Sequence, residues 1–397
     1  MILNRDTLIK QFNNNQDLNF IGIATCLQHA NAIDACIAQF KDKGIELKGY
    51  VLILSHFKTG CGLSWDCFIN ITNDNIVFVD FVDEFNEIKK PNIVFGRSFA
   101  YRSVSSNAAI RTIYVASTYI NYAWICLFEQ HVPSSKVNSI ILDDGSGTYA
   151  NQFKNNVRFT LQNYPGTIKI RAVTKLFLVL AYEKQLTKRM KNVGRVTDNR
   201  LFFLVNKDGR NVFCRNDGIA PYYDKIYASF KDTIPKEVAL QFEHCVVVNT
   251  QCFQENNITH NREDYYLYKE FICYLKEKNV PVVIKPHPRE VDKGKYQRFG
   301  VPVYMDNKYS QESIIGATKK RPFCVVSIFS STLLNIYGIF GIPAISLAKI
   351  MKKCETIDAI FKEELEDYIE LYQGTLEFPE TLDEAVQRIQ TLMEDNG

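Results

Sequence analysis

The chain has 397 residues, a net charge of +3, 46% hydrophobic residues and 23% charged residues. These are the values of an ordinary globular protein, and the small net charge gives no reason to expect a nucleic-acid-binding protein. The length exceeds what one hydrophobic core usually supports, so two domains are expected.

The cysteines and the start of the chain indicate a reduced compartment. None of the eleven cysteines forms a Cys-x-x-Cys pair, and no histidine pair flanks Cys61 and Cys67 at zinc spacing. Small buried hydrophobic residues are the commoner role of free cysteine. The opening MILNRDTLIKQFNNNQD lacks the apolar core of a signal peptide, and no stretch approaches the roughly 20 apolar residues of a membrane span. We therefore expect a cytoplasmic protein.

The first part of the chain alternates apolar runs with helical patterns. Phe20–Ala24 is predicted to be a buried strand, and Thr25 can cap the helix that follows it. Ala116–Glu129 fits an apolar helix or strand. Further strands are predicted in GYVLILSHF, NIVFVDFVDEF and NSIILDD. Strands that alternate with helices predict a parallel sheet with crossover connections.

Two adjacent carboxylates follow the last of these strands. Asp143 and Asp144 come directly after the apolar run 140–142 and precede Gly-Ser-Gly. Asp side chains are rarely buried without partners, and Gly-rich junctions after strands are where α/β proteins meet their ligands. The stretch therefore predicts a site. The pair could also hold a divalent metal ion.

The middle of the chain is basic. Residues 167–200 contain nine Lys or Arg residues against Glu183 and Asp198. This segment is expected either to lie near an anionic membrane surface or a charged lipid-linked acceptor, or to be a solvated helix face. Residues 200–221 are turn-rich and predict a hairpin.

The alternation of strands and helices restarts after Pro235. Strands are predicted in HCVVVN, in VPVVIK and at Val325–Ile328, and helices in DYYLYKEFICYLKEKN and at Leu382–Glu394. Two such halves predict an α/β fold with two Rossmann-like domains that face a central cleft. We place an N-terminal, acceptor-side domain over residues 1–235 and a C-terminal, nucleotide-binding domain over 236–397.

Two loops of the second half have the features of an anion site. Lys285 and His287 follow a strand and stand beside prolines, which make the turn stiff. Ser330, Ser331 and Thr332 lie between a strand and a helix, where hydroxyls and free N–H groups bind phosphate. Each pattern alone also fits a surface histidine or an ordinary helix cap. Together with the Asp pair they indicate a base and a phosphate cradle, the constellation of a sugar-nucleotide glycosyltransferase of the GT-B architecture.

The sequence resembles the bacterial GT-B sialyltransferases, in particular the lipooligosaccharide sialyltransferases of glycosyltransferase family 52 and their relatives. These families carry three short motifs in one order, which here read Asp143-Asp144-Gly145, His287-Pro288 and Ser330-Ser331. The openings TCLQHANAI and NTQCFQEN also look like the first strand-to-helix turns of the two family domains. The resemblance spans most of the chain and leaves out residues 167–235.

The resemblance implies a role for each motif. Asp144 is expected to be the general base, and Asp143 to brace its turn. Glu312 is the match to a ribose-binding Glu, although it follows Ser-Gln where the family usually has Pro-Phe. The expected set is His287 for catalysis at the leaving phosphate, Lys285, Pro288, Glu312, Ser330, Ser331 and Thr332 for the CMP-sugar donor, and Asp143, Gly145 and Ser146 for support of the turn.

The expected reaction is a single inverting transfer of sialic acid, or a related nonulosonic acid, from a CMP-sugar to a hydroxyl of a bacterial cell-surface glycan, as in lipooligosaccharide or capsule synthesis. No cofactor and no metal are expected, because dipoles and a His can hold a nucleoside monophosphate. A transferase of Kdo or pseudaminic acid, a glycerophosphotransferase of the teichoic-acid type, a nucleotide-sugar epimerase and a non-catalytic scaffold remain alternatives. A lipid-linked acceptor, peripheral contact with the inner membrane and a homodimer stay open.

Overall fold

The computed structural model describes residues 5–15, 17–24, 27–53, 76–80, 113–117, 137–143, 196–207, 210–255, 258–259 and 261–396. Its contacts divide the chain into two units. One unit comprises residues 1–59 and 68–200, and the other comprises residues 60–67 and 201–397. No helix among the described residues combines the length and the apolar character that crossing a bilayer requires.

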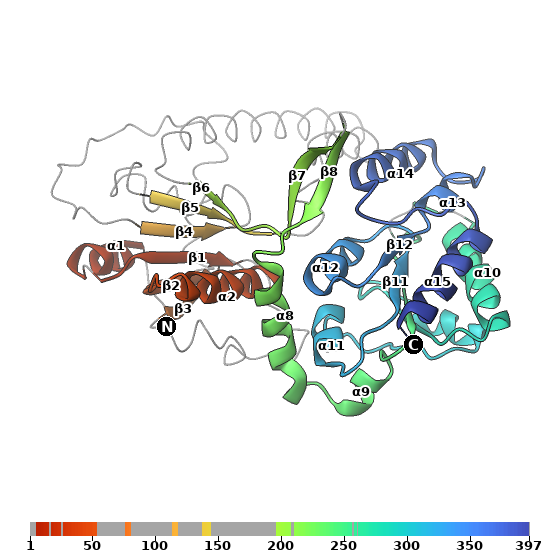
Figure 1. The fold of residues 1–397 in the computed structure, drawn as a ribbon, viewed down its shortest axis with the longest axis horizontal. Helices are drawn as coiled ribbons and strands as arrows, with labels where there is room; N and C mark the ends of the chain where they lie inside the picture. Colours follow the sequence, from red (N-terminus) through yellow and green to blue (C-terminus); the bar gives the residue numbers. More distant parts are fainter. Residues whose placement is uncertain are drawn as a thin grey trace. The chain divides into compact units, whose positions relative to one another are not determined.

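The first unit is built on a six-stranded sheet (Figure 1). Its strands follow the order β3-β2-β1-β4-β5-β6, and every neighbouring pair is parallel. This is the strand order of a Rossmann sheet. The elements are α1 (Arg5–Asn14), β1 (Phe20–Ala24), α2 (Leu27–Asp42), β2 (Gly49–Ile53), β3 (Ile76–Asp80), β4 (Ile113–Ser117), β5 (Val137–Ile141) and β6 (Val196–Asp198).

Helix α2 packs on the centre of this sheet, against β1 and β4. All five residues of β1 are buried, which explains its continuous apolar run. Gly22 in β1 allows the close approach of α2, because a Cβ at that position would lie 3.0 Å from Cδ1 of Ile33.

The second unit contains a four-stranded parallel sheet in the order β10-β9-β11-β12. Single-residue parallel bridges extend it at both edges, Val303 beside Ile284 and Glu377 beside Ile345. If Val303 and Glu377 are counted as strands and all six are numbered in chain order, the second sheet has the order 3-2-1-4-5-6, which is the order of the first sheet. The strands are β9 (Val246–Asn249), β10 (Val282–Lys285), β11 (Cys324–Ser327) and β12 (Ala344–Ser346).

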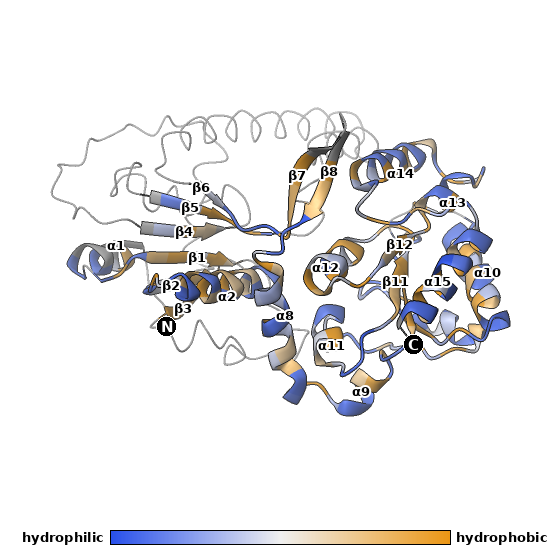
Figure 2. Ribbon diagram, in the orientation of Figure 1, coloured by the Kyte–Doolittle hydropathy of each residue, from blue (hydrophilic) through white to orange (hydrophobic). Residues whose placement is uncertain are grey.

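Helices cover both faces of this second sheet. Figure 1 shows α11 and α12 on one side of β11 and α10 and α15 on the other. In Figure 2, β11 is hydrophobic, whereas α10 and α15 carry hydrophilic segments, as expected for helices that have one face in solvent. The helices are α8 (Ala220–Ser229), η3 (Phe230–Asp232), α9 (Lys236–Leu240), α10 (Glu263–Glu277), η4 (Lys293–Phe299), α11 (Gln311–Ala317), α12 (Ser331–Phe340), α13 (Ala348–Lys352), α14 (Ala359–Tyr372) and α15 (Leu382–Asn396).

The predicted fold class, an α/β protein with two Rossmann-like units, is confirmed. The hairpin predicted over residues 200–221 is present as β7 (Phe202–Lys207) and β8 (Arg210–Arg215), which pair antiparallel. The predicted C-terminal helix is α15.

The division between the units falls after Arg200, earlier in the chain than the predicted boundary near residue 235. The reason is tertiary packing. Helix α8 contacts α11 and α12, and the guanidinium of Arg215 on β8 donates to the carbonyls of Gly338 and Ile339 at 2.8 and 3.1 Å. Residues 201–235 therefore group with the second unit, although the strand–helix pattern restarts only after them. The roles assigned to the two domains stay predictions.

Candidate functional site

Three strands of the second sheet end at one edge in polar residues. β9 ends at Asn249 and continues into Thr250, β10 ends at Lys285, and β11 ends at Ser327. Asn249 and Lys285 pair directly in the register of β9 and β10. The order of the sheet reverses between β9 and β11, and open α/β sheets bind ligands outside the carboxyl ends of the strands at such a point. This edge is the candidate site of the second unit.

The two motifs predicted in the second half follow strands that end at this edge. His287-Pro288 follows β10, and Ser330-Ser331 follows β11. Only β9 separates these strands, so their carboxyl ends lie about 10 Å apart, which is two strand spacings. The sheet therefore brings the His-Pro turn and the Ser-Ser helix start to the same region.

Ser330 shapes the start of α12. Its side chain accepts a hydrogen bond from the backbone N–H of Thr332 at 3.2 Å, and its backbone is extended, as in an N-cap. Ser330 is buried, whereas Ser331 is exposed. The two predicted phosphate-binding serines thus differ, because one is engaged in the cap and the other presents a hydroxyl beside the positive end of the helix dipole.

His287 is half-buried in the turn after β10. Its main-chain N–H donates to Oε1 of Glu290 at 2.9 Å, and its Nδ1 accepts from the backbone N–H of Arg289 at 3.2 Å. A ring nitrogen that accepts a hydrogen bond carries no proton, so the neutral imidazole holds its proton on Nε2. The turn therefore presents Nε2–H as a donor.

Burial keeps His287 neutral. Its pKa lies below the usual 6.5, first because the imidazole is buried and then because three cations stand near it, while the charge of Glu290 opposes them. The cations are Arg289, Lys285 and Lys293. At pH 7 the imidazole is therefore an uncharged hydrogen-bond donor in a positive environment.

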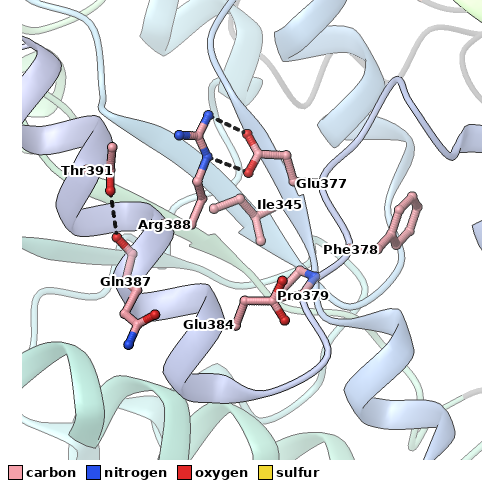
Figure 3. Close-up of a pocket in the computed structure, with 8 residues that line it drawn as sticks. All are labelled: Ile345, Glu377, Phe378, Pro379, Glu384, Gln387, Arg388 and Thr391. Atoms are coloured by element: carbon pink, nitrogen blue, oxygen red, sulfur yellow. Dashed lines mark hydrogen bonds and ion pairs between the residues drawn. The ribbon is translucent and has the colours of Figure 1, made fainter.

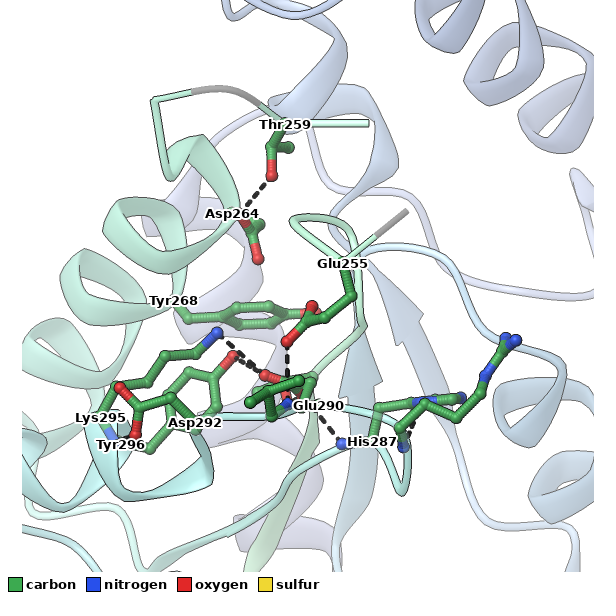
Figure 4. A network of polar contacts seen from close by, with 12 residues as sticks. Glu255, Thr259, Asp264, Tyr268, His287, Glu290, Asp292, Lys295 and Tyr296 are labelled. Carbon is green, nitrogen blue, oxygen red and sulfur yellow. Dashed lines mark hydrogen bonds and ion pairs between the residues drawn. The ribbon is translucent and has the colours of Figure 1, made fainter. Parts of the chain in front are cut away.

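Glu290 lies at the centre of a buried polar cluster (Figure 4). Its side chain is 0% exposed and forms an ion pair with Lys295 at 3.1 Å. The hydroxyl of Tyr296 donates to Oε2 at 2.7 Å, and the hydroxyl of Thr250 donates to Oε1. With the main-chain N–H of His287, four donors from the end of β9, the His-Pro turn and η4 meet on one carboxylate.

Two further side chains fix the strand ends around this cluster. Glu255, in the loop after β9, accepts at 3.0 Å from the backbone N–H of Val291 (Figure 4). The hydroxyl of Tyr268 donates to the carbonyl of Asn249 at 2.9 Å and accepts from the N–H of Ile328 at 3.2 Å. The loops after β9, β10 and β11 are thus held to one another by the exposed Glu255–Val291 contact and by the buried hydroxyl of Tyr268.

The remaining predicted donor-side residues lie in the same unit. Lys285 is 7% exposed, and its Nζ lies 5.5 Å from the centroid of the Tyr304 ring. Glu312 is in the first turn of α11, where its carboxylate accepts from the side-chain amide of Asn335 on α12 at 3.0 Å. Pro288 is exposed. Their roles toward a nucleotide stay predictions.

Of the Asp-Asp-Gly motif, the structure describes Asp143. This residue follows β5 directly and is 2% exposed. A buried carboxylate at the end of a strand fits a supporting role, which stays a prediction. Asp144, Gly145 and Ser146, and the basic residues 167–195, lie outside the described residues.

The sequence reasoning missed Glu290 and its partners. The only signal was a carboxylate three residues after His287 in the same stiff turn, together with the hydroxyl of Thr250 at the end of a predicted strand. The partners Lys295 and Tyr296 come from η4, whose burial the local pattern does not reveal.

Among the described residues, no group of three or more His, Cys, Asp or Glu side chains could hold a metal ion. A cavity of 280 Å³ lies between β12 and α15 (Figure 3), where Arg388 donates twice to Glu377 at 2.7 and 3.0 Å. It shares no lining residue with the candidate site.

The family comparison decides the class of this protein. The model of the alpha-2,8-polysialyltransferase family matches residues 21–349. The chain belongs to this family. It is a glycosyltransferase, and the resemblance to bacterial sialyltransferases inferred from the three motifs is confirmed.

Solved structures similar to this polysialyltransferase-family chain come from several enzymes. The α/β-galactoside α-2,3-sialyltransferase of Photobacterium phosphoreum is 10% identical, with 91% of this chain and 98% of that chain covered and a TM-score of 0.44. A sialyltransferase of Photobacterium damsela is 12% identical, with 91% of this chain and 81% of that chain covered and a TM-score of 0.40. The UDP-GlcNAc 2-epimerase of Neisseria meningitidis is 12% identical, with 96% of this chain and 100% of that chain covered and a TM-score of 0.41. A search of curated proteins gave no significant match.

Proposed function

We propose that this chain transfers sialic acid from CMP-sialic acid to a hydroxyl of a glycan acceptor, in one displacement that inverts the anomeric carbon. The observation that supports it best is His287, which is neutral, half-buried and oriented with Nε2–H as its donor. Lys285 ends the strand before it, and α12 begins at the same edge of the sheet. Together these groups offer positive potential and a hydrogen-bond donor to a leaving phosphate.

The proposal assigns the leaving group to the second unit. As the bond from the anomeric carbon to the phosphate oxygen breaks, negative charge grows on CMP. Nε2–H of His287 hydrogen-bonds that oxygen, and the hydroxyl of Ser331 and the dipole of α12 stabilise the phosphate. Because its pKa lies below 6.5, His287 donates a hydrogen bond at pH 7 rather than transferring a full proton.

Asp144 is the proposed general base. It would remove the proton of the acceptor hydroxyl as the oxygen attacks the anomeric carbon, and Asp143 would hold the turn. One carboxylate suffices, because a single displacement forms no covalent glycosyl-enzyme. The family name makes α-2,8-linked sialic acid the first acceptor to test.

Release of CMP tests the proposal. The purified chain should release CMP from CMP-sialic acid and extend labelled α-2,8-linked sialic acid oligomers, and the His287→Ala variant should do so much more slowly. Parallel reactions with CMP-Kdo, CMP-pseudaminic acid, CDP-glycerol and UDP-GlcNAc separate the alternatives. Turnover of another donor, with none of CMP-sialic acid, would refute the proposal. EDTA should leave most of the rate, since no step uses a metal.

We further propose that the basic segment 167–200 contacts an anionic membrane surface or a charged acceptor, on the ground of its composition alone. Flotation with anionic liposomes should recover the wild type and lose a variant in which Lys184, Lys188 and Arg189 are changed to Glu. Equal partitioning of the two proteins would contradict the membrane role.

A further inference from the structure

Glu290 joins parts of the donor-side region that the sequence keeps far apart. Its Oε1 accepts both from the main-chain N–H of His287 and from the hydroxyl of Thr250, 40 residues earlier in the chain. Its Oε2 accepts from Tyr296 and pairs with Lys295. One buried oxygen therefore fixes the His-Pro turn against the end of β9.

We propose that Glu290 is a positioning residue for the transfer reaction: its carboxylate holds the main chain of His287 at the carboxyl end of β9, so that Nε2–H meets the leaving phosphate. This inference rests on the proposed function. Glu290 acts through His287, because its side chain is 0% exposed and contacts the turn through the main-chain N–H of His287.

The contacts also show why stability alone does not account for the residue. A buried ion pair such as Glu290–Lys295 can often be replaced by apolar side chains of similar volume without loss of stability. An apolar side chain has no oxygen that could accept the hydrogen bonds of His287 and Thr250. The carboxylate oxygen is therefore what sets the position of the turn, and a misplacement of about 1 Å costs on the order of 100-fold in rate.

Two double variants, each of which removes one negative and one positive charge, distinguish loss of the hydrogen-bond acceptor at position 290 from loss of the ion pair. E290M/K295M removes both the ion pair and the acceptor oxygens, whereas E290Q/K295M removes the ion pair and keeps an amide oxygen that can accept from His287. We expect kcat for CMP release to fall roughly 10- to 100-fold in E290M/K295M and to be largely restored in E290Q/K295M. The control E377Q/R388M removes an ion pair of the same unit that lines the separate cavity (Figure 3), and its kcat should match the wild type.

A double-mutant cycle with His287→Ala decides whether Glu290 acts through the imidazole. In the His287→Ala background, the additional loss caused by E290M/K295M should be less than about twofold, because the group to be positioned is already absent. An equal fold-loss in both backgrounds would overturn the proposal. So would equal rates for E290M/K295M and E290Q/K295M in folded proteins.

The pKa of His287, measured by NMR, gives a readout that does not depend on activity. The charge of Glu290, a described carboxylate, raises this pKa against the charges of Arg289, Lys285 and Lys293. We therefore expect a lower His287 pKa in E290Q/K295M than in the wild type, with the resonance assigned through His287→Ala. An unchanged pKa would contradict the closeness of the Glu290 carboxylate to the imidazole, on which the proposal rests. A wild type that releases no CMP would instead refute the proposed function.

Discussion

Replacing Lys295 by methionine should strongly destabilise the second unit. The change leaves the carboxylate of Glu290, which is 0% exposed, without its cation. Breaking a buried ion pair from one side typically costs 3–5 kcal/mol. Three hydrogen bonds to Glu290 remain and compensate part of the charge, so we expect the lower end of this range, about 3 kcal/mol.

Thermal and urea unfolding would measure this effect. For a unit of this size, 1 kcal/mol corresponds to roughly 2–4 °C in Tm, so Lys295→Met should lower the Tm by roughly 6–12 °C. In urea the midpoint should fall while the m-value stays constant, since the surface exposed on unfolding is the same.

The partly exposed ion pair between Lys352 and Glu366 supplies the control. Its side chains are 40% and 43% exposed, and surface pairs are worth about 0–1 kcal/mol. Lys352→Met should therefore shift the Tm by a few degrees at most. If Lys295→Met and Lys352→Met gave equal shifts, the reasoning from burial of the Glu290–Lys295 pair would be wrong.

Three further outcomes are expected. Ser330→Ala should destabilise by about 1 kcal/mol through loss of the α12 cap and raise the KM for CMP-sialic acid, and unchanged unfolding would exclude the cap. The folded-state pKa of His287 lies below its unfolded value of about 6.5, so its contribution to stability is present above pH 6.5 and lost as pH falls through the folded pKa. In His287→Gln the urea midpoint should therefore change less between pH 7 and pH 5 than in the wild type. Asp144→Asn should lose about 10²–10⁴-fold in turnover, whereas Asp143→Asn should mainly lower the Tm, and the reverse pattern would exchange their roles.

The alternation of strands and helices was predictable because short apolar runs mark buried parallel strands. The strand order was not, since it depends on pairings between distant residues, such as Phe20 of β1 with Tyr114 of β4. The sequence pattern also did not indicate the position at which the two units divide. It depends on packing of α8 and on the bonds of Arg215 to α12, which leave no local periodicity.

The candidate site was predictable where backbone chemistry marks it. The prolines beside His287 predict a stiff turn, and the hydroxyl of Ser330 predicts the start of a helix. Glu290 was not predictable, because a Glu in a polar turn ordinarily faces solvent. Its burial follows from Lys295 and Tyr296, which η4 brings back onto the turn.

The single-residue bridges of Val303 and Glu377 have a consequence for self-association. An exposed edge strand offers a row of free N–H and C=O groups on which another chain can build a ladder. Among the described residues, the outermost pairing at each edge of the second sheet is one residue long, so neither edge presents a run there that a second molecule could extend. Association through this four-stranded sheet at high concentration should therefore proceed by its side-chain surfaces and not by addition of strands at its edges.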